Sequence, residues 1–283
     1  MAGLNNSLTK ARTNKGNLSA YLSQDAIKAK INEVVGGKDG QRFISAIVSA
    51  TTNNAALQEC SSSSILSAAL LGESLKLSPS PQLGQYYLVP FNDKEKGKVA
   101  QFQLGYKGYI QLAIRSGQYK KLNVMAIKEG ELIRFDPLNE EIEVKLIEDD
   151  DEREATPTIG YYAFFEYTNG FRKAIYWSRK KMEAHAIKYS PGYKRDLEKG
   201  SQWTFWSKDF DGMAFKTMLR QLISKWGIMS IELQSAIDAD MAVINDDGTK
   251  NYVETDEENY IEAEVVEVKE EQPTTAQDAL FGE

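Results

Sequence analysis

The alternation of apolar and polar residues is clearest between residues 84 and 117. Residues 86–91 form an apolar, aromatic run, a polar segment with Asn, Asp and Gly follows, and residues 99–104 alternate between the two classes. This pattern predicts a β-hairpin. After Gly105 the apolar residues recur at helical spacing until Gly117, which predicts a short helix directly after the hairpin.

The same spacing rules predict helices and strands along most of the chain. Helices are predicted over about 23–35, 39–52, 61–77, 179–189, 203–226 and 230–243. Further strands are predicted over 120–127, 132–135, 141–147, 159–167 and 171–177. Residues 149–154 and 190–202 are predicted to be loops, the second long, rich in glycine and charge, and mobile.

These elements predict an α+β fold in which β-hairpins form a small sheet packed with helices. We expect three regions: a flexible N-terminal arm over 1–22, a core over 23–245 and an acidic C-terminal tail over 246–283. The arm is polar with three bases, and the tail changes abruptly in composition, so both are expected to lack a packed core of their own.

The charge of the chain is unevenly distributed. The formal net charge is −7, but the tail alone carries 13 acids and 2 bases, so the remainder is net +4. Residues 148–152 read EDDDE and contribute −5 of that remainder. A basic body favours a polyanionic partner, although a basic face kept for solubility explains the composition equally well.

The sequence lacks the features of several protein classes. No run of 18 apolar residues and no apolar leader is present, and Cys60 is the only cysteine, so we expect a cytoplasmic protein without membrane segments. Cys60 with His185, the only histidine, would be the only thiol–imidazole pair, but a buried thiol is the better interpretation. No phosphate-binding GxxxxGK[ST] loop exists, which argues against ATP-driven chemistry.

Basic and aromatic residues are interleaved between Arg172 and Lys225, which hold 13 bases and 5 acids. Such interleaving suits nucleic acid, because bases bind phosphates and aromatic rings stack on nucleobases. The predicted helix 179–189 opens with three cations, against the preference for acids at a helix N-terminus. The predicted helix 203–226 carries a stripe of residues spaced by four, at Lys208, Gly212, Lys216 and Arg220.

The helix predicted after the hairpin has features that suit phosphate as well. Lys107 and Arg115 lie near its two ends, and glycines precede and follow it. Glycine lets a backbone approach a ligand closely, so this segment is a candidate for contact with a phosphate backbone.

Five segments together resemble the RecT/Redβ superfamily of phage and prophage single-strand annealing proteins. They are GESLKLSPSPQLGQYYLVPF (72–91), QFQLGYKGYIQLAIRSG (101–117), VMAIKEGE (124–131), GYYAFFEYTNG (160–170) and WSKDFDGMAFKTMLRQLISKWG (206–227). The family's tryptophan, its Met-Ala-x-Lys-Thr motif and the following arginine fall on Trp206, Met213 to Thr217 and Arg220. The resemblance covers roughly residues 30–240.

The resemblance implies an ATP-independent protein that binds single-stranded DNA, forms rings or helical filaments of identical subunits, and anneals complementary strands. It implies a long basic and aromatic helix lining a DNA groove. No cofactor is expected, and Mg²⁺ would only modulate DNA binding, without a dedicated site. The implied partners are a 5′→3′ exonuclease and the host single-strand-binding protein, the latter through the acidic tail; a solubilising tail is the alternative.

The residues predicted to contact DNA combine the resemblance with the basic and aromatic pattern. For phosphate and backbone contact they are Gln103, Lys107, Arg115, Lys120, Lys121, Arg179, Lys180, Lys216 and Arg220, and for an apolar wall Trp206 and Phe210. Two other classes stay open at this point: a passive single-strand-binding protein and a metal-dependent nuclease. A nuclease would need acids that converge from ordered elements, whereas residues 148–152 are predicted to be a solvated acidic turn.

Overall fold

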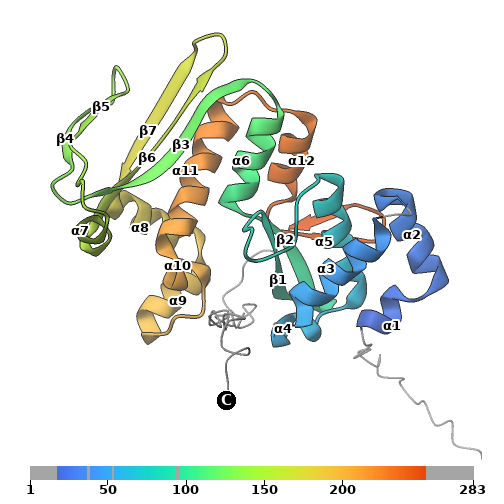
Figure 1. The fold of residues 1–283 in the computed structure, drawn as a ribbon. Coiled ribbons are helices and arrows are strands. Elements are labelled where there is room, and N and C mark those ends of the chain that lie inside the picture. Colours follow the sequence, from blue (N-terminus) through green and yellow to red (C-terminus); the bar gives the residue numbers. More distant parts are fainter. Residues whose placement is uncertain (1–17, 37–38, 53, 94–95, 253–283) are drawn as a thin grey trace, which may run out of the picture.

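The described residues between 18 and 74 form a helical layer around one buried helix (Figure 1). The computed structural model describes residues 18–36, 39–52, 54–93 and 96–252. The helices of this layer are α1 (Leu18–Leu22), α2 (Asp25–Val35), α3 (Gly40–Thr52), α4 (Ala55–Gln58) and α5 (Ser62–Ser74). Ser61 caps α5 by accepting from the Ser64 amide, at the point where the predicted helix 61–77 begins. Most of α5 is buried, because α2 packs on it from outside and a sheet from inside.

The predicted hairpin forms the first sheet. Strands β1 (Tyr86–Asp93) and β2 (Gly97–Leu104) pair antiparallel from Tyr86 opposite Leu104 to Asp93 opposite Gly97. The sheet order is β1-β2-β8-β9, with β8 (Ala242–Ile244) and β9 (Lys250–Tyr252) added on the far side of β2. Residues of both faces of β2 are buried, because β2 is an inner strand that contacts both α5 and α12 (Ile231–Ala239).

The second sheet has the strand order β3-β6-β7, with antiparallel pairing throughout. Its strands are β3 (Tyr119–Lys128), β6 (Thr158–Tyr167) and β7 (Arg172–Ser178). Helices α8 (Arg179–Tyr189) and α11 (Phe210–Trp226) pack on it, and α11 also contacts α6 (Tyr106–Arg115). Helix α11 therefore lies between the second sheet and α6, as Figure 1 shows.

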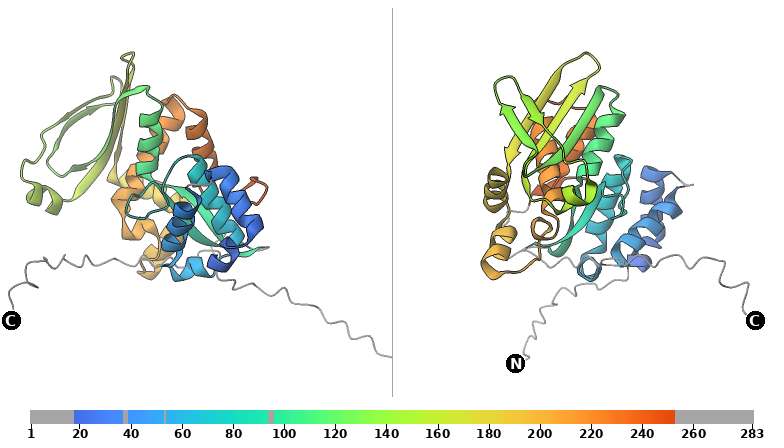
Figure 2. Two further views of the ribbon diagram at one scale, coloured as in Figure 1. Left: turned by 45° about the vertical axis from the view of Figure 1, so that its right-hand side comes forward. Right: turned by 60° about the vertical axis from the view of Figure 1, so that its left-hand side comes forward.

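A short hairpin, β4 (Leu132–Asp136) and β5 (Glu141–Val144), stands in front of the second sheet as a separate layer (Figure 2). It is followed by α7 (Asp150–Ala155), where the sequence predicts a loop; Asp149 caps α7 by accepting from the Glu152 amide. We call residues 129–155 the acidic arm, because they hold 12 acids and 3 bases. Fully buried Glu131 fastens the arm, accepting from the Arg153 guanidinium and from the amides of Lys128 and Ile147.

The α+β class is confirmed, and several further predicted elements differ in detail. Residues 190–202 contain helix α9 (Pro191–Lys199) instead of a long loop, because Ser190 caps it and Pro191 starts it. The predicted helix 203–226 is two helices, α10 (Phe205–Lys208) and α11, each with its own N-cap, at Thr204 and Asp209.

The end of the described chain also differs from the prediction. The helix predicted over 230–243 ends at Ala239, and the chain turns at Met241, whose φ is +69°, into β8. Strand β9 then lies beyond residue 245, where the composition predicts the start of the tail. The predicted arm over residues 1–17 and the predicted tail over 253–283 lie outside the described residues. No described helix is both long enough and apolar enough to cross a membrane.

Candidate nucleic-acid interface

One face of α8, together with Trp177 of β7, carries exposed cations beside aromatic rings that are half-buried or exposed. Trp177 lies near the end of β7, and His185 lies between Trp177 and Tyr189, with ring centroids 5.4 and 4.6 Å apart. Lys181 Nζ lies 4.3 Å from the Trp177 ring centroid, and Lys188 Nζ lies 5.1 Å from that of Tyr189. We call these five residues the α8 strip. Rings and ammonium groups in one row offer both stacking surfaces and phosphate contacts.

The α8 strip follows from helical spacing. Lys181, His185 and Tyr189 are four residues apart, and Lys188 is three from His185, so all lie on one side of the helix. Tyr189 is 62% exposed, and both lysines are exposed. The contacts predicted on this helix, Arg179 and Lys180, do not include these residues, although their spacing is visible in the sequence.

The surroundings of the α8 strip are basic as well. Residues 179–199 of α8 and α9 hold 7 bases and 3 acids. Lys180, predicted to contact phosphate, is exposed in the first turn of α8, and Lys199 is exposed at the end of α9. Burial first, and then the nearby cations Lys188 and Arg220, lower the pKa of His185. His185 is therefore neutral at pH 7, and the strip's positive charge there comes from its lysines.

Arg179 is half-buried and is held in place by several partners. Its guanidinium donates to Glu183, to the Tyr161 hydroxyl at 2.8 Å and to Asp211 at 3.4 Å. It also lies 3.7 Å from the centroid of the Phe210 ring. Arg179 therefore joins α8 to β6 and α11, and it shields the half-buried Phe210 from solvent.

Trp206, predicted as part of an apolar wall, is 7% exposed and lies in the core formed by α8, α11 and the second sheet. Its ring packs against Phe210 at 5.0 Å and Tyr193 at 6.1 Å. Trp203, three residues earlier, is 49% exposed. The buried Asp196 carboxylate fixes this stretch, because it accepts hydrogen bonds from the amides of Trp203 and Thr204.

Lys216 and Arg220 both face one buried carboxylate. The Lys216 ammonium lies 2.9 Å, and the Arg220 guanidinium 2.8 Å, from the fully buried Asp240 side chain. Asp240 also accepts from the Leu104 amide at 3.0 Å. The Lys216 side chain is only 8% exposed, whereas that of Arg220 is 38% exposed. Asp240 thus offsets the two like charges of Lys216 and Arg220, although it lies 20 residues beyond Arg220 in the sequence. The same carboxylate ties α11 to β2 and to the end of α12.

The predicted contacts at the two ends of α6 are both exposed, but they differ in their protein partners. Lys107 is exposed in the first turn. Arg115, at the other end, donates to the carbonyls of Leu75 and Lys76, both at 2.7 Å, and so binds the end of α5. Gln103 is half-buried on β2.

The glycines around α6 serve close contacts within the protein. A Cβ at Gly105 would lie 2.1 Å from the Gly84 carbonyl oxygen, and one at Gly108 would lie 2.1 Å from the Gln85 carbonyl oxygen. The glycines that suggest close approach of a phosphate therefore serve another purpose: they let two segments of the protein backbone pack against each other.

Lys120 and Lys121, at the start of β3, share one carboxylate. Their ammonium groups lie 2.5 and 3.9 Å from the two oxygens of Glu166. The two lysine side chains are nevertheless 57% and 62% exposed, so they remain open to a ligand from solvent.

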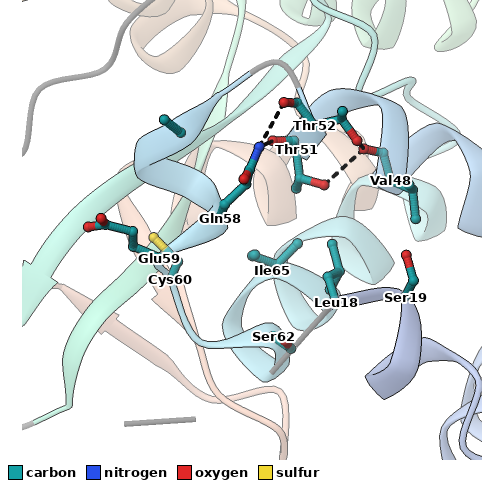
Figure 3. Close-up of a pocket in the computed structure, with 11 residues that line it drawn as sticks. Leu18, Ser19, Val48, Thr51, Thr52, Gln58, Glu59, Cys60, Ser62 and Ile65 are labelled. Atoms are coloured by element: carbon teal, nitrogen blue, oxygen red, sulfur yellow. Dashed lines mark hydrogen bonds between the residues drawn. The ribbon is translucent and has the colours of Figure 1, made fainter. Parts of the chain in front are cut away.

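A cavity of about 600 Å³ lies among α1, α3, α4 and α5 (Figure 3). Val48, Ile65 and Cys60 line it together with hydroxyl groups such as that of Thr51.

The predicted alternatives to DNA binding at Cys60 and His185 are settled by their places in the fold. Burial raises the pKa of the Cys60 thiol to about 12. Cys60 packs in the N-terminal core, whereas His185 contacts Trp177 and Tyr189, so the two residues do not form a thiol–imidazole pair. Within the described ranges, no three His, Cys, Asp or Glu residues gather as a metal site would require.

A mixed α/β core with an exposed basic and aromatic helix face is a class of structure suited to binding polyanions. The comparison with known families is specific: the RecT family model matches residues 41–267, and the chain belongs to the RecT family. The chain is 38% identical over 265 residues to the uncharacterized protein YqaK of Bacillus subtilis (strain 168), covering 92% of this chain and 84% of that protein. It is 34% identical over 188 residues to protein RecT of Escherichia coli (strain K12), covering 65% of each. The resemblance drawn from the sequence is thereby confirmed, and the chain stands among recombination and annealing proteins.

Proposed function

We propose that this protein binds single-stranded DNA and anneals complementary strands without ATP, as an oligomer of identical subunits. Two things support the proposal: membership of the RecT family, and the α8 strip, which offers rings and cations together at the surface. Annealing requires no bond to be made or broken by the protein, so we propose that it is not an enzyme and needs no cofactor.

The proposed binding surface consists of exposed cations. Around the α8 strip these are Lys180, Lys181 and Lys188, and elsewhere Lys107, Lys120 and Lys121 extend the set of phosphate contacts. Gln103 is a proposed contact to the sugar–phosphate backbone. Lys216 and Arg179 act by holding the elements that carry these groups, since their charged ends are engaged by protein partners. Arg115 binds the end of α5 but is exposed, so it stays a proposed phosphate contact. Arg220 also pairs with Asp240, but its guanidinium side chain is partly exposed, so we propose that it can contact DNA as well.

The proposed mechanism is electrostatic. Cations neutralise the backbone of one strand while its bases stay available to a second strand, so base pairing supplies the specificity. A matched duplex is retained because its second backbone is neutralised as well. We further propose a partner 5′→3′ exonuclease that produces the single strands, and contact with the host single-strand-binding protein through the acidic tail.

The first experiment tests the α8 strip. We expect Lys181→Ala with Lys188→Ala to weaken binding to a 30-nucleotide single strand, and to reduce the slope of log K against log salt by about 0.7 for each phosphate interaction removed. The matched control is Lys28→Ala with Lys145→Ala, which removes two exposed lysines from α2 and the acidic arm. Equal decreases in both variants would mean that only net charge matters, and would count against the strip.

The second experiment tests annealing itself, with two complementary labelled strands, purified protein and no ATP. We expect pairing to be faster than without protein. A protein that coats the strands and slows pairing would be a passive single-strand-binding protein. Degradation of the strands in the presence of Mg²⁺ would instead identify a nuclease. Either result would replace the proposed function.

A further inference from the structure

The α8 strip has a complementary segment within the same chain. Residues 253–283 hold 11 acids and one base, together with apolar residues such as Leu280 and Phe281. The α8–α9 surface offers the opposite character, with 7 bases against 3 acids and exposed side chains such as Tyr189. We propose that residues 253–283 occupy the α8 strip of their own molecule when DNA is absent, and that single-stranded DNA displaces them. This inference rests on the proposed function, since it takes the α8 strip as the DNA surface.

The reach of the segment permits this contact. The chain leaves the described fold at Tyr252, the end of β9 at the edge of the first sheet. Thirty-one residues follow, which span up to roughly 100 Å when extended. A folded core of this size has a radius of gyration of about 17 Å. Tethering then gives the segment an effective concentration in the millimolar range at any face of its own core.

The charges of the fold favour the α8–α9 surface over other parts of the molecule. The acidic arm, with its 12 acids, would repel the segment. Lys216 and Arg220 share the carboxylate of Asp240, and the exposed Lys120 and Lys121 share that of Glu166, so much of the positive charge at these two places is already offset. Lys181 and Lys188, by contrast, have aromatic rings as their neighbours. An anionic segment with apolar residues fits such a surface better than it fits a plain cluster of lysines.

The contact has a consequence for binding. A tethered anionic segment that DNA must displace lowers the apparent affinity for DNA. It also lowers the salt dependence of that affinity, because the displaced segment takes up counterions while the bound DNA releases its own. DNA binding would also free Leu280 and Phe281. The same segment would thus be available to partner proteins only on molecules that have bound DNA.

The test uses the full chain with four tail acids neutralised: Glu262→Gln, Glu264→Gln, Glu267→Gln and Glu270→Gln. The matched control neutralises four exposed acids of the acidic arm: Glu129→Gln, Glu143→Gln, Glu148→Gln and Glu154→Gln. At about 50 mM salt we expect the tail variant to bind a 30-nucleotide strand roughly three- to tenfold more tightly than the unchanged chain, with a steeper salt slope. We expect a much smaller change in the arm variant. Equal changes in both variants, or none in the tail variant, would overturn the proposal.

A second measurement does not depend on DNA affinity. Zero-length carbodiimide coupling of the unchanged chain, analysed by mass spectrometry, should join carboxylates of residues 253–283 to Lys180, Lys181 or Lys188 within one molecule. Added single-stranded DNA should suppress these products. Products found only at other lysines, or only between molecules, would reject the contact. If no variant binds DNA, the proposed function fails, and the coupling pattern alone decides whether the tail contact exists.

Discussion

Asp240 shows how one side chain decides the role of two others. It is fully buried, and it faces Lys216 and Arg220 at 2.9 and 2.8 Å while accepting from the Leu104 amide. A buried carboxylate with two cationic partners is strongly stabilised, and each partner is in turn held in place. Two cations of the RecT motif therefore contribute to the fold whether or not Arg220 also contacts DNA.

We predict that Asp240→Asn lowers the free energy of unfolding by about 3 to 5 kcal/mol, because it leaves the buried Lys216 without its counter-charge. Urea unfolding followed by circular dichroism measures the change. The control Lys225→Ala removes an exposed cation from the same helix and should change stability by less than about 0.5 kcal/mol. A stable Asp240→Asn protein with reduced DNA binding would show that the pair serves binding instead of folding.

At the scale of elements, the joint between α9 and α10 depends on Asp196. Its carboxylate accepts from the hydroxyls of Ser201, Thr204 and Ser207 and from the amides of Trp203 and Thr204. Burial by itself would raise the pKa of Asp196, but these hydrogen bonds lower it to about 2. The ionised carboxylate thus closes the turn that carries the exposed Trp203.

This joint predicts a dependence of stability on pH. Because the pKa of Asp196 is lower in the folded than in the unfolded state, its contribution is complete above about pH 4 and is lost as the pH falls toward 2. The decrease amounts to roughly 2 to 3 kcal/mol. Urea unfolding between pH 5 and pH 2.5 should show a shallower fall for Asp196→Asn than for the unchanged chain. Parallel curves would mean that Asp196 is not the titrating group.

Most elements are predictable because local signals and tertiary packing agree. The hairpin of β1 and β2 combines alternation with a polar turn, and α8 has a clear capping serine. Helix α9 is not predicted because its glycine and charges outweigh the Ser190–Pro191 start signal. The break between α10 and α11 is hidden because apolar spacing runs through it, although Asp209 is a good cap. Strand β8 is hidden because its residues continue a helical pattern until Met241 takes a positive φ.

The candidate site is predictable only in part, and the reason is physical. Composition and spacing show where cations are, but the acid that engages a cation can be distant in sequence. Asp240 lies 24 residues from Lys216, and Glu166 lies 46 residues from Lys120. Only the fold separates cations that hold elements together, such as Lys216, from exposed ones such as Lys181.

At the scale of the whole molecule, the charge is divided between a basic body and the acidic arm. The arm projects in front of the second sheet, and Glu131 and Arg153 fasten its base (Figure 2). The Arg153 guanidinium donates to both oxygens of Glu131 and to the Ala126 carbonyl. Burial by itself would raise the pKa of Glu131, but hydrogen bonds from Arg153 and from two amides lower it. The arm is thus an acidic surface that a buried ion pair holds in a fixed position.

We predict that Arg153→Met loosens the acidic arm while the rest of the fold persists, because Glu131 then remains buried without a counter-charge. Limited proteolysis should cut within residues 129–157 at least about tenfold faster, with the remaining fragments resisting cleavage. The control Arg134→Met removes an exposed partner of Glu141, 4.0 Å away, and should leave the cleavage rate nearly unchanged. Cleavage spread evenly over the chain would show that Arg153 supports the whole core, in which case the arm is not a separately stabilised part of the molecule.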